Sequence, residues 1–269
     1  MPTKKEFLGE LGGTFILIYL GVGAVMTAVS TGAQVGLWQV AVVWGVAVAL
    51  AIYTFGAASG AHINPAITLA MATYRGFPWR KVPGYVLAQF IGAFIASILL
   101  YLQFKGVLEH FELSVGLVRG QSGSELSAMT LANYFPHQGM LKQHGWANEV
   151  SGLFTAMSAE FVGTGMLAAF VFALTDPNNG AGPGPKLTPP FIGLAVAALI
   201  SVLAPLSQAC LNPIRDIGPR LVAWLAGWGP MAFPGPYGFF LVYVLSACLG
   251  ALAGAYLYRI MTCYQPAKN

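Results

Sequence analysis

Charge is what this sequence has least of. Only 8% of its 269 residues are Asp, Glu, Lys or Arg, and 57% are apolar, whereas a soluble domain carries roughly 25% charged residues. No charged residue occurs between Leu11 and Tyr74. This shortage excludes an ordinary soluble domain and indicates an integral membrane protein with several spans.

Other absences narrow the function. The three cysteines form neither a CxxC motif nor a paired framework, and no basic cluster is larger than Lys4-Lys5 or Arg80-Lys81. No nucleophile, base and orienting group come together, and neither a phosphate-binding glycine loop nor metal-ligand spacing is present. We therefore expect no enzyme, no cofactor, no metal and no nucleic-acid partner.

Six apolar segments reach the length of about 20 residues that a helix needs to cross a bilayer. These predicted spans are Phe7–Val29, Trp38–Ala58, Val82–Leu102, Val150–Leu174, Thr188–Ser207 and Phe239–Tyr258. Two shorter apolar stretches, Pro65–Tyr74 and Pro213–Trp224, would form helices about 15–18 Å long, half the thickness of a bilayer. Such stretches predict re-entrant half-helices, which are tolerated where protein or a cavity surrounds their irregular approaches.

The two short stretches begin alike. Asn64-Pro65 and Asn212-Pro213 lie 148 residues apart (212 − 64), and each places a good N-cap residue before a proline at the first helical position. The head of the first span, Glu10–Thr14, also has a counterpart in Glu160–Thr164. Because each half has three full crossings, an odd number, the second half must enter from the opposite face, which makes an inverted repeat.

We therefore predict an all-α membrane protein with six transmembrane helices and two re-entrant half-helices. It would form one channel domain, 1–269, with inverted repeats at about 5–104 and 149–260 and an outer loop at 105–148. Eight lysines and arginines flank one side of the predicted spans and five flank the other. This bias favours both termini in the cytoplasm.

The paired motifs resemble those of the aquaporin family, and their details resemble its glycerol-facilitator branch. The resemblance is carried by Ser59–Ala66, Leu211–Arg220 and Ala223–Gly229, with loop pieces Val118–Gly120 and Tyr134–Pro136. An acid directly after Arg215, here Asp216, is typical of the glycerol branch. The resemblance implies the aquaporin fold and a homotetramer in the plasma (inner) membrane, with one pore in each protomer.

The resemblance places the pore centre at the two Asn-Pro motifs. Its residues are Asn64, Pro65, Ala66, Asn212, Pro213 and Ile214. Each asparagine would cap its half-helix and offer its amide to a passing oxygen, while the two helix N-termini, each equivalent to about half a positive charge, would disfavour cations. Ile214 replaces the alanine usual in the family, and we expect a small local shift there. The alternative is two ordinary helix caps in a transporter with broken helices.

Arg215 follows Asn212 by three residues, and a cation within the membrane is costly enough to be a candidate functional residue. The resemblance groups it with Trp44, Ile200 and Ala209 as a selectivity filter. Trp44 would receive the carbon backbone of a polyol while Arg215 binds its hydroxyls; a packing or lipid-facing tryptophan is the alternative. Ala209 stands where an aromatic ring is usual and Ile200 where glycine is usual, so the filter departs from the family pattern.

Two further groups complete the predicted site. The resemblance implies pore-lining carbonyls at Gly60, Ala61, His62, Ala209, Cys210 and Leu211. Glu10 and Glu160 occupy equivalent positions in the repeat, and we expect them to accept hydrogen bonds from the unpaired amides of the re-entrant segments. Asp216 is expected to support the loop. A proton relay in a coupled transporter is the alternative role for the two glutamates.

The predicted function is a passive channel for glycerol and other small uncharged solutes, including small polyols, with some water and without ions or protons. A water-selective aquaporin is the first alternative, and Trp44 and Asp216 argue against it. The second alternative, from a different class, is an ion-coupled secondary transporter with broken helices. The two glutamates deep in the predicted spans, Glu10 and Glu160, are its only support.

Overall fold

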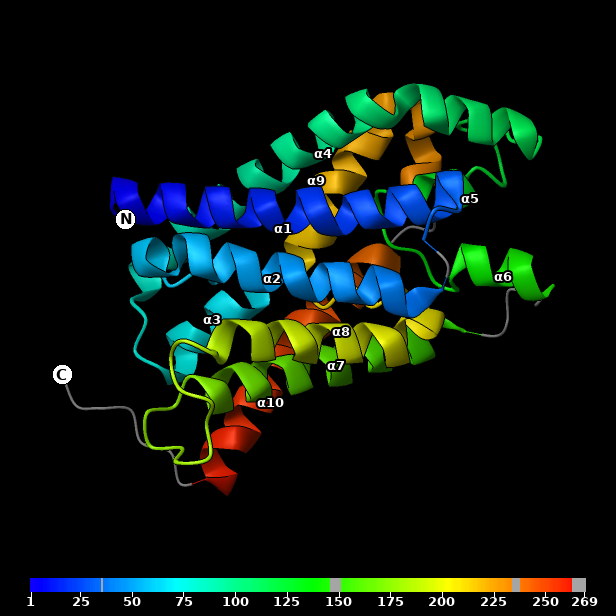
Figure 1. The fold of residues 1–269 in the computed structure, drawn as a ribbon. Helices are drawn as coiled ribbons and strands as arrows, with labels where there is room; N and C mark the ends of the chain where they lie inside the picture. Colours follow the sequence, from blue (N-terminus) through cyan, green and yellow to red (C-terminus); the bar gives the residue numbers. More distant parts are fainter. Residues whose placement is uncertain (35, 146–150, 234–237, 263–269) are drawn as a thin grey trace.

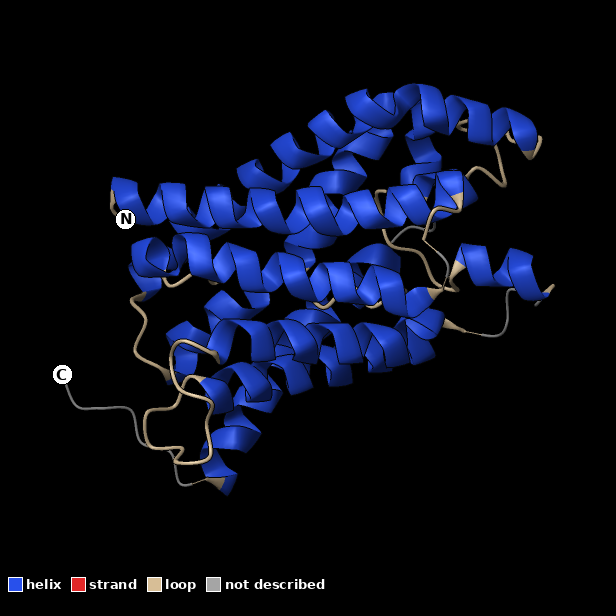
Figure 2. Ribbon diagram, in the orientation of Figure 1, coloured by secondary structure: helices blue, strands red, loops and turns tan. Residues whose placement is uncertain are grey.

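The computed structural model describes residues 1–34, 36–145, 151–233 and 238–262. Within these residues every regular element is helical (Figure 2). Six helices are long and apolar enough to cross a membrane, and they run side by side in one bundle (Figure 1). Both ends of the described chain lie on one side of the bundle, here termed the terminal face, and α5 and α6 lie on the other, the loop face (Figure 1).

The two halves of the chain have the same order of elements. The first half contains α1 (Lys4–Thr31), α2 (Leu37–Ser59), α3 (Pro65–Tyr74) and α4 (Val82–Ser114). The second contains α7 (Leu153–Leu174), α8 (Thr188–Ser207), α9 (Pro213–Ala223) and a last span in which the π-helical turns Phe240–Ser246 lead into α10 (Ala247–Met261). Between them lie the short helices α5 (Glu125–Ala128) and α6 (Gln138–His144).

The predicted spans agree closely with the observed helices, apart from their ends. Thr188–Ser207 and Pro65–Tyr74 are found with the predicted limits, while the first residue of the predicted span Val150–Leu174 lies outside the described residues. The helix α4 continues 12 residues beyond Leu102, to Ser114. This extension is possible because it buries Leu108 and Glu112 against the rest of the protein, so part of the predicted outer loop is helical.

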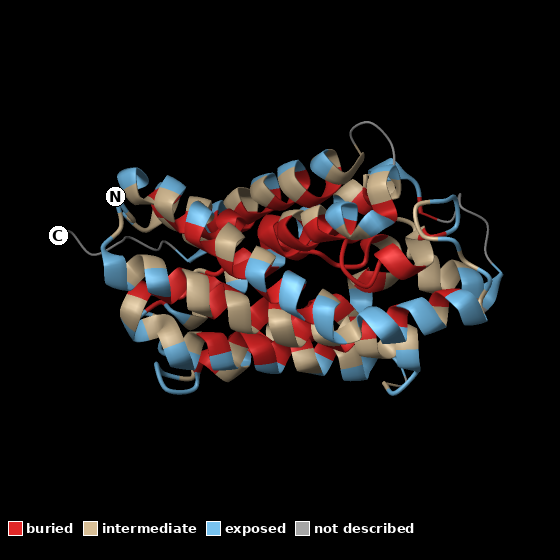
Figure 3. Cartoon of the chain, turned by 90° about the horizontal axis from the view of Figure 1, so that it is seen from above, coloured by how far each residue is buried: buried red, intermediate tan, exposed pale blue. Residues whose placement is uncertain are grey.

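Small residues bring the helices into close contact. A Cβ atom added to Gly45 of α2 would lie 2.6 Å from the carbonyl oxygen of Gly193 on α8, so glycine is required where these two helices cross. Buried residues fill the interior, and the exposed ones lie on the outside of the bundle (Figure 3). Many of those exposed side chains are large and apolar, as expected of helices that face lipid.

The half-helices α3 and α9 begin inside this bundle. Each starts directly after an asparagine in extended conformation and has proline in its first turn. Because proline lacks an N–H group and has a nearly helical φ angle, it fits the first helical position. In the approach segments before α3 and α9, residues 60–64 and 208–212, only the first amide bonds back to the preceding helix, so other groups must satisfy the amides that follow.

Candidate pore and selectivity filter

Each half-helix is capped by the side chain of its own asparagine. Asn64 Oδ1 accepts from the amide of Ala66 at 2.9 Å, and Asn212 Oδ1 accepts from the amide of Ile214 at 3.1 Å. Ile214, the residue that departs from the family pattern, is buried at 3% exposure. The second helix start therefore forms with isoleucine in place, and the small local shift at Ile214 stays a prediction.

The two caps also bind each other's approach segment. Asn64 Nδ2 donates to the carbonyl of Leu211 at 2.8 Å, and Asn212 Nδ2 donates to the carbonyl of Ile63 at 2.8 Å. An amide NH₂ group carries two donors, so this reciprocal pair leaves one N–H of each asparagine for another acceptor. The N-termini of α3 and α9 thus meet within the bundle.

A buried glutamate collects the unpaired amides of the first approach segment. Glu10 accepts from the amides of His62 and Ile63 at 2.8 Å each, from Ser59 Oγ at 2.7 Å and from Gln89 Nε2 at 2.7 Å. Its exposure is 0%. Buried backbone N–H groups need partners, and this one carboxylate satisfies two that have no helical acceptor.

Glu160 does the same for the second approach segment. It accepts from the amides of Cys210 and Leu211 at 2.8 Å each and from Ser207 Oγ at 2.7 Å. The side chain of Cys210 packs behind this segment with Val242 and Tyr243, so the residue contributes its backbone to the lining.

The approach segments adopt a backbone that residues other than glycine seldom adopt. Ala61 and Ile63 have φ angles of 46° and 44°, and Ala209 and Leu211 have 46° and 54°. A left-handed conformation at such residues costs of order 1–3 kcal/mol each and persists only where surrounding contacts fix it. The hydrogen bonds to the two glutamates supply these contacts. We did not predict this alternation, because nothing in the residue types requires it.

The same hydrogen bonds set the direction of the carbonyl groups. In a planar trans peptide the N–H and C=O groups point in opposite directions. Because the amides of His62 and Ile63 point at Glu10, the carbonyls of Ala61 and His62 point away from it. The corresponding carbonyls in the second half, which belong to Ala209 and Cys210, point away from Glu160 for the same reason.

A continuous cavity of about 580 Å³ runs past both approach segments. It extends from Thr175 and Thr188, near the terminal face, to Leu126 and His137, near the loop face. Eleven of the predicted site residues line it: Trp44, Gly60, Ala61, His62, Asn64, Ile200, Ala209, Cys210, Leu211, Asn212 and Arg215. The other predicted residues, which are Glu10, Pro65, Ala66, Glu160, Pro213, Ile214 and Asp216, are buried in the wall behind it.

Arg215 lies at the cavity beside Trp44. Its guanidinium carbon is 5.0 Å from the centroid of the Trp44 ring, and its Nη1 donates to the carbonyl of Leu131 at 2.7 Å. Gly21 gives the indole its place, because a Cβ atom there would overlap the Trp44 ring. Among the described residues no carboxylate forms an ion pair with Arg215. Among these residues, the Leu131 carbonyl is the one hydrogen-bond acceptor of the Arg215 side chain.

Arg220, five residues further along α9, donates four hydrogen bonds to the protein, at least one from each of its nitrogens. It forms a two-pronged ion pair with Asp216, at 2.7 and 2.8 Å, and donates to the carbonyls of Asn133 and Ala232. Asp216 also accepts from the amide of Asn133 at 2.8 Å. The acid after Arg215 thus contacts the loop and Arg220, and it leaves Arg215 without a carboxylate partner.

Sequence reasoning missed several supporting residues. Ser59 and Ser207 each stand five residues before an Asn-Pro motif, so the internal repeat could have revealed them. Gln89, Gln208 and Leu131 gave no such signal, because each acts through contacts with residues distant in the sequence: Gln208 Nε2, for example, donates to the loop carbonyl of Met129 at 2.9 Å.

Comparison with known proteins gives relatives over nearly the whole chain. The glycerol uptake facilitator protein of Haemophilus influenzae is 40% identical and covers 95% of this chain and 93% of its own length. The propanediol uptake facilitator PduF of Citrobacter freundii is 37% identical, with 96% of this chain and 92% of its own length covered. Among solved structures, the aquaglyceroporin from Plasmodium falciparum is 25% identical with a TM-score of 0.80, and 96% of each chain is covered.

The sequence model of the family described as Major intrinsic protein matches residues 1–258. This match spans both half-helices, both buried glutamates and the candidate filter, and the structural likeness confirms the predicted aquaporin fold. The chain belongs to the major intrinsic protein family.

Proposed function

We propose that this chain is a passive channel that conducts glycerol and other small uncharged solutes, with some water, across a membrane. The observation that carries the proposal is the continuous cavity, lined by Asn64 and Asn212 at its centre and by Arg215 and Trp44 on the loop-face side. Relatives named as glycerol and propanediol facilitators support the same class of solute.

The chemistry of the filter favours short polyols. A polyol presents hydroxyls and CH groups on different edges. Arg215 supplies N–H donors to the hydroxyls, while the indole face of Trp44 and the branched side chain of Ile200 supply apolar surfaces to the carbons. On the side of the filter formed by Ala209, the side chain is only a methyl group. Restoring a ring with Ala209→Phe should therefore lower the permeability of larger polyols more than that of glycerol.

Ions and protons are excluded by fixed charges and donors. The N-termini of α3 and α9 meet at the centre, and each is equivalent to about half a positive charge. Arg215 adds a full charge beside the cavity. A cation therefore meets repulsion at two levels, and a chain of waters is oriented by donors at the centre, which interrupts proton transfer. This arrangement requires no catalysis and no cofactor.

We further propose that the protein assembles as a homotetramer in the plasma (inner) membrane with both termini in the cytoplasm. On this orientation the terminal face is cytoplasmic and α5 and α6 lie outside. The excess of lysine and arginine near the terminal face supports it. The repeats at 5–104 and 149–260 then form one channel domain.

Stopped-flow light scattering on proteoliposomes separates the channel from its rivals. The channel predicts glycerol entry that does not saturate and that is independent of pH and sodium gradients. Water efflux without solute re-entry would instead identify a water-selective pore. Saturable uptake driven by a gradient would identify a coupled transporter.

Arg215→Ala tests the filter. A hydrogen bond to a charged group contributes about 1.5–3 kcal/mol, so we expect the permeability of five-carbon polyols relative to glycerol to rise by about tenfold or more. The stability of the protein in detergent should change little, because Arg215 has no carboxylate partner among the described residues. An unchanged permeability ratio would place the filter elsewhere.

A further inference from the structure

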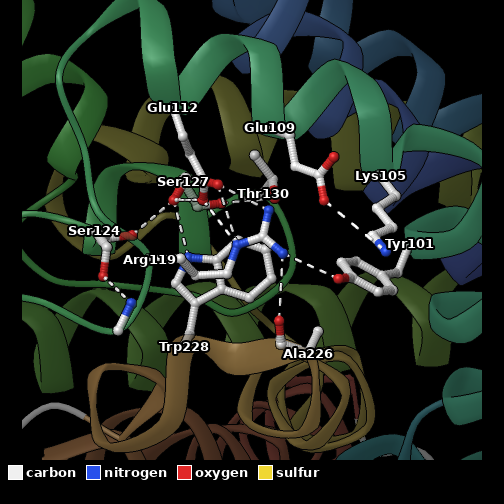
Figure 4. Close-up of polar contacts among 11 residues, drawn as sticks. Tyr101, Lys105, Glu109, Glu112, Arg119, Ser124, Ser127, Thr130, Ala226 and Trp228 are labelled. Atoms are coloured by element: carbon white, nitrogen blue, oxygen red, sulfur yellow. Dashed lines mark hydrogen bonds and ion pairs between the residues drawn. The ribbon is translucent and has the colours of Figure 1, made fainter.

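A cluster of polar residues on the loop face has no part in the pore as described so far. Arg119 donates three hydrogen bonds to the Glu112 carboxylate, at 2.8, 3.1 and 3.1 Å. Its guanidinium carbon lies 4.2 Å from the centroid of the Trp228 ring, and Figure 4 shows it between Glu112 and that indole. Glu112 and Trp228 in turn both bind Ser127 Oγ, at 2.7 and 2.9 Å. We call Glu112, Arg119, Ser127 and Trp228 the loop-face clamp.

The clamp is buried, which distinguishes it from an ordinary surface ion pair. The side chains of Arg119 and Glu112 are 15% and 7% exposed, and Ser127 and Trp228 are both 0% exposed. Burial alone would lower the pKa of Arg119, but its hydrogen bonds to Glu112 and the charge of that carboxylate raise it above the ordinary value. Arg119 therefore keeps its charge.

One side of the clamp holds the segment that supports Arg215. The backbone carbonyl of Ser127 accepts hydrogen bonds from the amide and the hydroxyl of Thr130, at 3.2 and 2.8 Å. The next residue, Leu131, supplies the carbonyl that accepts from Arg215 Nη1. Leu131, whose carbonyl fixes the filter arginine, is thus four positions after Ser127, whose hydroxyl the clamp holds, and a tight turn joins the two residues.

The other side of the clamp holds the half-helix that carries Arg215. Arg119 Nη1 donates to the carbonyl of Ala226 at 3.3 Å, and it faces Trp228. Both belong to the π-helical turn Trp224–Trp228, which continues directly from α9. The clamp therefore binds the element that bears the donor and the loop that bears the acceptor, and it fixes the distance between them.

We propose that the loop-face clamp is a positioning element for the selectivity filter, which sets Arg215 through the loop that carries Leu131. The inference rests on the proposed function, because it assumes that Arg215 selects the solute. Arg215 depends on this support more than Arg220 does. Among the described residues, the backbone carbonyl of Leu131 is the one acceptor of the Arg215 side chain, while Arg220 has a bidentate acid and two carbonyls.

The test measures the permeability of xylitol relative to glycerol in proteoliposomes that contain equal amounts of folded protein. Glu112→Gln breaks the charge pair, and Ser127→Ala removes the link to the loop while leaving the pair intact. Both should raise the ratio by about two- to fivefold, in the direction of Arg215→Ala but by less, since they loosen the arginine without removing it. A purely structural role would lower stability or total flux and leave the ratio unchanged.

The chain supplies a matched control on the same helix. Glu109 lies three residues before Glu112 and pairs with Lys105 at 4.0 Å, with both side chains more than half exposed; Figure 4 shows the two pairs together. Glu109→Gln removes the same charge and should leave the ratio unchanged, because exposed pairs contribute little. If Glu112→Gln fails to fold, the permeability ratio of Ser127→Ala tests the clamp on its own.

The outcomes separate this inference from the proposed function. If Arg215→Ala changes the ratio and neither Glu112→Gln nor Ser127→Ala does, the clamp inference is wrong and the filter stands. If Arg215→Ala leaves the ratio unchanged, the filter is misplaced and both are overturned. A shift in Glu109→Gln equal to that in Glu112→Gln would also overturn the clamp, since it would reflect charge on the loop face alone.

Discussion

Residues 59–64 and residues 207–212 approach the centre of the bundle with the same backbone but are secured by different means. In both, a serine and two amides bind one buried glutamate. Glu10 also receives Gln89 from α4, within the same half of the chain. No described residue supplies Glu160 with this fourth donor; instead, Gln208 binds Met129 and Tyr134 in the loop between the halves.

The difference extends to the lining of the cavity. The third residue after Asn64 is Ile67, and the third residue after Asn212 is Arg215, and both line the cavity. The first approach is thus followed by an apolar residue, and its glutamate takes all four of its donors from its own half. The second is followed by Arg215 of the proposed filter, and it contacts the loop between the halves. We therefore expect sequence changes in that loop to alter selectivity without disturbing the centre, where the two asparagines meet.

The largest expected effect is the loss of a glutamate. Glu10→Gln and Glu160→Gln each leave buried amides facing an NH₂ group or an empty site, and breaking a buried charged network costs about 3–5 kcal/mol. We expect Glu10→Gln to lower the midpoint of thermal unfolding in detergent more than Glu160→Gln, because Glu10 has four donors and Glu160 has three. Equal effects would show that Gln89 adds nothing.

Gln89→Leu provides the matched control for this comparison. It removes the fourth donor and leaves Glu10 with the same three kinds of donor as Glu160. The loss should be smaller than that of Glu10→Gln, about 1.5–3 kcal/mol for one hydrogen bond to a charged group. In this background, Glu10→Gln should cost about as much as Glu160→Gln does in the wild-type protein.

Replacing either of two glycines behind the approach segments, Gly13 or Gly163, with alanine should have an effect of intermediate size on glycerol flux. A Cβ atom on Gly13 would lie 2.8 Å from Ile63, and one on Gly163 would lie 2.5 Å from Leu203 and 2.6 Å from Leu211. Overpacking costs about 1–3 kcal/mol, and it would push the residue before each asparagine toward the lumen. We expect both alanine variants to reduce glycerol flux, and Gly163→Ala more, because it meets two side chains. Light scattering on proteoliposomes measures the flux of both variants.

Gly106→Ala is the control for these two variants. A Cβ atom at Gly106 would lie in open space, as it would at Gly32. Gly106 is the better choice of the two, because Gly32 has a positive φ angle of 66° and an alanine there would be strained.

The smallest expected effect is a pH dependence of stability that arises from His137 on the loop face. Burial lowers the pKa of His137 to about 4, so the ring that lines the cavity stays neutral at pH 5 and above, and glycerol flux should be constant between pH 8 and pH 5. An unfolded histidine has a pKa near 6.5. The unfolded state therefore binds the proton first, and stability declines as pH falls from about 6.5 toward 4. His137→Asn keeps a cap for α6 and should reduce that decline in thermal unfolding; an identical pH dependence would show that His137 titrates normally.

Much of the fold could be predicted from the sequence because it follows from local chemistry. The scarcity of charge gives the spans, and Asn64-Pro65 and Asn212-Pro213 give the starts of the half-helices, since cap and proline preferences act over a few residues. The extension of α4 to Ser114 could not be predicted in this way. Its residues after Leu102 include charged ones, and they are helical because Leu108 and Glu112 find partners elsewhere in the chain.

The site, like the fold, has features that the sequence predicts and features that it does not. The repeat identified Glu10, Glu160 and both asparagines, because each recurs at a matching position in the two halves. The left-handed φ angles at Ala61 and Ile63, the support of Arg215 by Leu131 and the loop-face clamp arise from contacts between residues far apart in the chain. Residue types and spacing therefore determined which groups are present. Only the tertiary structure decided where they point, because a strained backbone and a buried arginine take the geometry that their distant partners fix.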